Sequence, residues 1–231
     1  MPDATRSTDD DPQLAAALAG RAPLRTRAVL ATGWGAVPGS KRWLLLGMLL
    51  WLAVAVTATA LGVVLRLPEA VAASLSVIAT APVSLALTMY AVRRVAGVAT
   101  DLEALQRYRP AVAHAVLVLM LASLVVTAAD ALLGPSIGAA VALLYGLLTG
   151  QALFLVADRG VDAFTAIGWS VRASLPVLGT LLVVQLTLAL ALVVGAVTFG
   201  IGLIWAAPFA LLSLGAVSYQ LFGTRAAPPT A

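Results

Sequence analysis

Residues 174–222 read SLPVLGTLLVVQLTLALALVVGAVTFGIGLIWAAPFALLSLGAVSYQLF and contain no Asp, Glu, Lys or Arg. A transmembrane helix needs about 20 consecutive apolar residues, so this stretch is long enough for two. It is rich in Leu and Ala and lacks the alternation of polar and apolar residues that marks membrane strands. Gly200 stands between the two halves and favours a tight turn, because glycine tolerates a positive φ. The stretch therefore predicts an antiparallel pair of transmembrane helices.

The whole chain has the composition of a membrane protein. Of its 231 residues, 61% are hydrophobic and only 10% are charged, and none is cysteine. A soluble domain carries about 25% charged residues, so a soluble enzyme, a disordered protein and a disulfide-rich secreted domain are all excluded. The apolar runs predict spans at residues 43–65, 70–91, 111–133, 136–157, 174–199 and 201–222. The predicted fold class is all-α: a polytopic membrane helical bundle of six helices in three hairpins.

The basic residues predict how the chain is inserted. Every Lys and Arg except Arg66 precedes the first span, follows the sixth, or lies in the second-to-third or fourth-to-fifth connection. Positive charge resists translocation, so both termini are expected in the cytoplasm. No signal peptide is recognised. Residues 1–22 are expected to be a mobile cytoplasmic tail, 23–224 the transmembrane domain and 225–231 a second tail. The basic clusters form no continuous soluble face, which excludes nucleic acid as a partner.

Each hairpin is expected to follow an amphipathic cytoplasmic lead-in helix. Apolar residues recur at helical spacing before the third and fifth spans, and such helices can lie in the headgroup layer. The two stripes are Val95, Val98, Leu102 and Leu105, and Val161, Phe164, Ile167, Gly168 and Val171. Gly33-Trp34 before the first hairpin matches Gly168-Trp169 before the third. The pattern indicates a threefold internal repeat, although equal spacing also arises whenever helices of one length follow each other.

The last hairpin carries a resemblance to a known family. It runs from Leu175-Pro176 through Gly200-Ile201-Gly202 to Ala207-Pro208 and Tyr219-Gln220-Leu221-Phe222, after a Gly-Trp lead-in and a basic cluster. Residues 30–222 resemble a family of six-helix bacterial integral membrane proteins related to the membrane domain of glycerophosphodiester phosphodiesterases. The resemblance implies a bacterial cytoplasmic (inner) membrane location. It implies no reaction and no functional residues, and no phosphodiesterase catalytic domain is present.

Residues able to carry chemistry are scarce. The chain has one histidine, His114, and none of the phosphate-loop, dinucleotide-binding, zinc-protease or serine-hydrolase motifs. No catalytic, cofactor-binding or metal-ligating residue is predicted, and no cofactor. The chain is therefore expected not to be an enzyme.

Polar residues inside the predicted spans are the candidate contacts. A buried primary amide without a partner is costly in a bilayer, so Gln185 in the fifth span is expected to face the bundle interior. Gln151, Tyr145 and Thr187 are its candidate partners. A hydrogen bond between Gln185 and one of these residues would hold helices together. In the alternative, the amide binds a solute. Asp130 near the outer end of the third span is either an interfacial carboxylate or a substrate or proton site, and His114 at the inner end is either a solvated imidazole or a relay member.

Proline and arginine supply the remaining candidates. Pro82 and Pro208 are expected to kink the second and sixth spans, and the kinks either line a cavity or serve packing alone. Gly146 and Gly150 have the spacing that permits close helix approach. The basic residues between the second and third spans are expected to contact anionic headgroups at the cytoplasmic face. These residues are Arg93, Arg94, Arg107 and Arg109.

The sequence thus predicts a non-enzymatic multi-pass membrane protein, a membrane-organising or accessory component that acts through lipid or protein contacts. Its expected partners are membrane lipids, with a membrane protein or a second copy of the chain as further candidates. The alternative is a small-solute transporter or channel with a polar route lined by the fourth and fifth spans. The two differ at the midplane, where a transporter needs a polar path and an accessory protein is packed shut.

Overall fold

The computed structural model describes residues 11–98, 108–198 and 200–224. Every regular element in these ranges is a helix, which confirms the all-α fold class. The elements are α1 (Pro12–Leu18), α2 (Thr26–Ala36), α3 (Lys41–Val64), α4 (Glu69–Val95), η2 (Arg109–Ala111), α6 (Val112–Leu133), α7 (Pro135–Thr149), α8 (Ala152–Arg159), α9 (Ala163–Ser174), η3 (Leu175–Val177), α10 (Leu178–Val197) and α11 (Leu203–Phe222).

Six helical segments of the described chain are long and apolar enough to cross a membrane. They begin at Lys41, Glu69, Arg109, Pro135, Ala163 and Leu203, and each contains most of one span predicted from the sequence. This number and composition indicate a multi-pass membrane protein. The predicted tight turns are also present: Gly134, with φ of 81°, ends α6 directly before Pro135 begins α7.

The fourth predicted span, 136–157, is two helices and not one. α7 ends at Thr149 and α8 begins at Ala152. Ser170 of α9 lies against the break, where its hydroxyl accepts the Gln151 N–H at 3.2 Å and donates to the Leu148 carbonyl at 2.7 Å. A fully buried serine therefore satisfies backbone groups that leave the regular helix pattern at this point.

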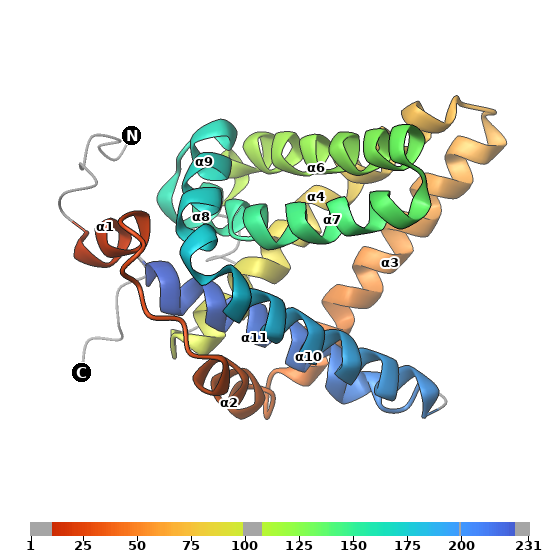
Figure 1. Ribbon diagram of the computed structural model, residues 1–231. Coiled ribbons are helices and arrows are strands. Elements are labelled where there is room, and N and C mark those ends of the chain that lie inside the picture. Colours follow the sequence, from red (N-terminus) through yellow and green to blue (C-terminus); the bar gives the residue numbers. More distant parts are fainter. Residues whose placement is uncertain (1–10, 99–107, 199, 225–231) are drawn as a thin grey trace.

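The three hairpins meet at one end and separate toward the other. In Figure 1, α6 and α7 lie above α10 and α11, while α3 and α4 cross behind them. α4 and α11 cross where Gly215 faces Ala91: a Cβ added at Gly215 would lie 2.8 Å from the Ala91 carbonyl carbon. Lys41, at the start of α3, places its ammonium over the ring of Trp205, in the first turn of α11. α11 therefore crosses the beginning of the first hairpin at a steep angle.

The short helices α1, α2, α8 and α9 gather at the end where the hairpins meet (Figure 1). The predicted mobile tail over 1–22 is wrong for Pro12–Leu18, which form α1. Leu14 and Ala17 are each only 1% exposed, and Gln13 Nε2 donates to the Tyr219 and Gln220 carbonyls at 3.2 Å. α1 is ordered because it buries these side chains against the end of α11. Residues 1–10 and 225–231 lie outside the described part.

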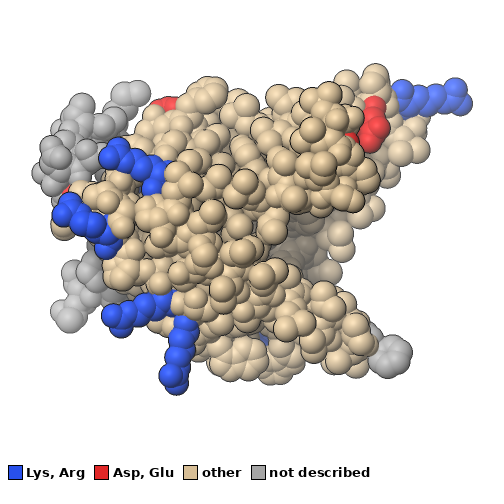
Figure 2. Space-filling view, viewed as in Figure 1, with Lys and Arg blue, Asp and Glu red and all other residues tan. Residues whose placement is uncertain are grey.

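The charges are distributed as unevenly in space as along the chain. Every described Lys and Arg except Arg66 belongs to the short helices, to their linkers, or to the adjoining ends of α3, α4 and α6. Figure 2 shows these blue side chains over one end and the lower edge of the molecule, with a single blue side chain at the far end. Arg66 lies in the α3–α4 turn, near Glu69 at the start of α4.

Among the described residues, helices α2 and α9 precede the first and third hairpins as predicted lead-ins. α9 buries its small residues Ala163, Ala166 and Ala173, whereas Phe164 of the predicted apolar stripe is 67% exposed. The two Gly-Trp pairs also differ. Gly33 lies directly against Ser213 of α11, while Gly168 has open space around it among the described residues. The stripe residues Leu102 and Leu105 lie outside the described residues.

Candidate functional site

A cavity of about 240 Å³ lies between α4, α7, α10 and α11. Its wall is mainly apolar. The lining residues are Thr88, Ala91, Ala142, Leu143, Gly146, Leu147, Gly150, Gln151, Leu181, Val184, Gln185, Leu211, Leu214, Gly215, Val217 and Ser218. In the space-filling view the surface is hollowed between the α6–α7 and α10–α11 hairpins (Figure 2). The hollow exists because these two hairpins diverge from the end where all three meet.

Gln151 closes one side of this cavity through a bond to another helix. Its side chain is 5% exposed, and its Oε1 accepts the hydroxyl proton of Ser218 on α11. The same Ser218 hydroxyl lies 3.3 Å from the Leu214 carbonyl of its own helix. Gln151 thus joins the α7–α8 break to α11. A contact of this kind between helices was predicted for Gln185.

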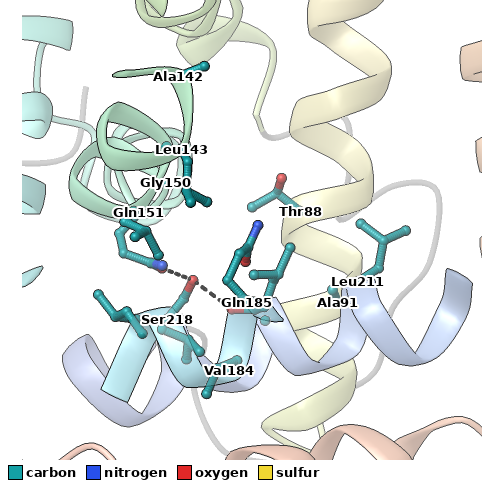
Figure 3. Close-up of a pocket in the computed structure, with 16 residues that line it drawn as sticks. Thr88, Ala91, Ala142, Leu143, Gly150, Gln151, Val184, Gln185, Leu211 and Ser218 are labelled. Atoms are coloured by element: carbon teal, nitrogen blue, oxygen red, sulfur yellow. Dashed lines mark hydrogen bonds between the residues drawn. The ribbon is translucent and has the colours of Figure 1, made fainter. Parts of the chain in front are cut away.

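Gln185 extends from α10 into the centre of the cavity (Figure 3). It is partly exposed, and within the described ranges no hydrogen bond of its amide is recorded. The expected bond to Thr187 or Tyr145 is wrong. Thr187 donates to the Val183 carbonyl of its own helix at 2.8 Å, and Tyr145 is not among the described residues that line the cavity. The structure does bring Gln185 and Gln151 to the same cavity, as expected.

Asp130 and His114 lie away from the cavity. Both side chains are exposed, near opposite ends of α6 as predicted. Asp130 folds over the start of α7, where a Cβ added at Gly138 would lie 2.9 Å from the Asp130 Cα and would collide with its carboxylate. A negative charge at this position is favourable because it faces the N-terminal end of α7.

The two prolines do not line the cavity. Pro82 and Pro208 lie inside the continuous helices α4 and α11, the first exposed and the second buried. Neither proline belongs to the wall of this cavity, to which other residues of α4 and α11 contribute. Gly146 and Gly150 also differ from the expectation: Gly146 has open space beside it within the described chain, and both line the cavity instead of a close helix contact.

The basic residues predicted to contact headgroups have different environments. Arg94 donates from Nη2 to the Pro38 carbonyl at 2.6 Å and from Nε to the Ala36 carbonyl at 3.4 Å, and thereby caps the end of α2. Arg109 is exposed and Arg93 is partly buried. Arg107 lies outside the described residues. Headgroup contact stays a prediction for all four.

Arg159 is the charged residue that sequence reasoning missed. It follows an apolar run and precedes Gly160, which is typical of a solvated loop, but it is only 6% exposed. Its guanidinium pairs with Asp11 and donates to the Phe222 carbonyl, and Asp158 lies beside it. Arg159 therefore joins α1, α8 and the end of α11. A buried arginine is tolerable when it is paired and hydrogen-bonded in this way.

The pKa of Asp11 reflects this contact. Burial raises it, but hydrogen bonds from the Leu14 and Gln13 N–H groups and the nearby Arg159 guanidinium outweigh burial and lower the pKa below its ordinary value. Asp11 is thus held as the carboxylate. It also caps α1, since its Oδ1 accepts the N–H of Leu14 at 3.1 Å.

The described residues that line the cavity include no ionisable side chain. Within the described ranges no group of three or more His, Cys, Asp or Glu could hold a metal ion. No protein-family model matches the chain, and comparisons with curated proteins and with solved structures return no match. The resemblance to the membrane domain of glycerophosphodiester phosphodiesterases therefore stays a prediction.

Proposed function

We propose that this chain is a non-enzymatic protein of the bacterial cytoplasmic membrane that holds a lipid in the cavity between α7 and α10, as a membrane-organising or accessory component. The observation that carries the proposal is the cavity itself: its wall is mainly apolar and four helices contribute to it. A concave apolar site with a few polar groups is the usual form of a small-molecule site. In a bilayer, the molecules available to fill such a site are lipids.

The residues around the cavity support access from the bilayer. Leu143 and Leu144 of α7 are 41% and 48% exposed, and Leu182 and Leu186 of α10 are also exposed. These leucines belong to helices that cross the membrane, so their exposed surfaces would meet acyl chains. A chain could thus pass between α7 and α10 without leaving an apolar environment.

The charge distribution supports an orientation. With the basic end in the cytoplasm, α1 and the end of α11 would be cytoplasmic, and Arg93 and Arg109 would face anionic headgroups, at about 1 kcal/mol for each charge near the surface. This orientation leaves Arg66 as the described basic residue at the outer face. A membrane protein or a second copy of the chain remains a proposed partner.

Filling the cavity tests the proposal. Gly146 lines the cavity and has open space beside it in the described chain, so Gly146→Leu places a side chain where a ligand would lie. Gly179→Leu is the matched control, because Gly179 also has open space and belongs to α10 outside the described cavity wall. Native mass spectrometry of protein extracted in mild detergent should show retained lipid on the wild type and on Gly179→Leu, and none on Gly146→Leu. Equal retention by both variants would contradict the proposal.

One observation favours the transporter alternative. Gln151 and Gln185, from the fourth and fifth predicted spans, line the same cavity. A transport route needs water at this point. Because the chain has no cysteine, Gln151→Cys and Gln185→Cys can be tested singly with membrane-impermeant thiol reagents. The lipid-binding proposal predicts no reaction in intact membranes, whereas reaction at both positions would favour transport.

A further inference from the structure

The described cavity wall contains no charged side chain. Its polar members are Thr88, Gln151, Gln185 and Ser218, and the rest are apolar residues and glycines. A phosphate or an ammonium group inside this wall would lose its hydration without meeting an opposite charge, which is strongly unfavourable in an apolar environment. The wall therefore selects against charged headgroups.

The hydroxyls of Thr88 and Ser218 and the amide oxygen of Gln151 are already hydrogen-bonded within the protein. Thr88 Oγ1 donates to the Ser84 carbonyl at 2.9 Å, and Ser218 and Gln151 are bonded to each other. Gln185 has no recorded hydrogen bond within the described residues, and its amide points into the centre of the cavity (Figure 3). This amide offers two N–H donors and one carbonyl acceptor, and in a bilayer no bulk water is present to satisfy them.

We infer that the cavity binds the headgroup of an uncharged lipid that carries hydroxyl or ester groups, and that Gln185 is the residue that recognises it. The inference rests on the proposed function and names its ligand class. The volume of about 240 Å³ lies just below the range of about 300–1,000 Å³ that is usual for sites of small molecules, which suits a small headgroup. A glycerol monoester headgroup with its first methylenes has this size, and the acyl chain extends between α7 and α10.

The test compares two photoreactive lipids that share the same acylated glycerol and differ only in a phosphate group. Both carry the same diazirine-labelled acyl chain, one on glycerol (a monoacylglycerol) and one on glycerol phosphate (a lysophosphatidate). The wild-type protein in phosphatidylcholine nanodiscs is irradiated, and cross-linked peptides from α7 and α10 are quantified. We expect the glycerol probe to label these peptides about tenfold more than the phosphate probe, or more, because the phosphate would lose its hydration against a wall that carries no opposite charge.

Gln185→Leu keeps the size and apolar body of the side chain and removes the amide. It should lower labelling of α7 and α10 by the glycerol probe about tenfold, the factor that about one net hydrogen bond supplies, while labelling by the phosphate probe stays low because the wall still carries no opposite charge. Thr187→Val is the matched control, because the Thr187 hydroxyl bonds to its own helix and its side chain is not among the described cavity residues. Equal labelling of lipid-facing α3 peptides in all variants verifies folded, inserted protein.

The outcomes separate this inference from the proposed function. Equal labelling of the wild type by both probes, a preference for the phosphate probe, or unchanged glycerol-probe labelling in Gln185→Leu would overturn the inference and leave lipid binding intact. Absence of cross-links from either probe to α7 and α10, with normal labelling of α3, would refute the proposed function as well.

Discussion

At the scale of single residues, glycine positions differ sharply in what they tolerate. Gly138→Ala should destabilise the protein by about 1–3 kcal/mol, the usual cost of overpacking, because the new Cβ would lie within 3 Å of the Asp130 backbone. Gly168→Ala is the control: no described atom lies near its Cβ, and alanine in a helix is more stable than glycine by about 0.5–1 kcal/mol. Thermal unfolding in detergent measures both, and a neutral Gly138→Ala would show that α6 and α7 do not meet as described.

The serine at the break between α7 and α8 gives a second residue-scale prediction. Ser170→Ala leaves the Gln151 N–H and the Leu148 carbonyl without the hydroxyl that now satisfies both, at an expected cost of about 1–3 kcal/mol for a buried unsatisfied group. Ser74→Ala should change stability little, because the Ser74 hydroxyl only bonds to the Ala70 carbonyl of its own helix. The comparison uses the midpoints of thermal unfolding, and equal midpoints for the two variants would count against the described break.

At the scale of elements, the docking of α1 should depend on the Asp11 charge. The pKa of Asp11 is lowered from its ordinary value of 3.8, so its contribution is fully present above about pH 4 and is lost as the pH falls through the lower folded-state value. Asp11→Asn keeps an N-cap residue and removes the charge.

The measurement for α1 is the difference in Tm between wild type and Asp11→Asn as a function of pH. The difference should be constant between pH 7 and about pH 4 and should vanish below that range. A difference that grows on acidification would mean that the Asp11–Arg159 pair does not hold α1 in place.

The sequence predicts those elements that composition alone determines. Six apolar runs of bilayer length leave few alternatives to six transmembrane helices. Gly134-Pro135 predicts the turn between two of them, because proline cannot continue a helix. α1 was missed because its stability comes from the Leu14, Gln13 and Arg159 contacts with distant segments. The break after Thr149 was missed for the same reason, since the serine that supports it is on α9.

At the scale of the whole molecule, the candidate site depends on how the hairpins cross. The sequence identified Gln151 and Gln185 as buried amides, since polar side chains inside apolar spans are conspicuous. It could not predict which of them bonds to Ser218 and which stays open, because that depends on how α11 packs against the α7–α8 break. Pro82 and Pro208 are the opposite case. A proline inside a predicted helix is easy to recognise in the sequence, but neither proline lies at the described site.

The central claim is that a lipid and not water fills the cavity between α4, α7, α10 and α11. A nitroxide spin label on Leu147→Cys, where it replaces a cavity-lining side chain instead of filling open space, reports this directly in reconstituted vesicles of the otherwise cysteine-free chain. Molecular oxygen concentrates in the bilayer interior, and a nickel chelate concentrates in water. Collisions with oxygen should far exceed those with the nickel chelate at this position, whereas the reverse ratio would show a water-filled cavity and contradict the account.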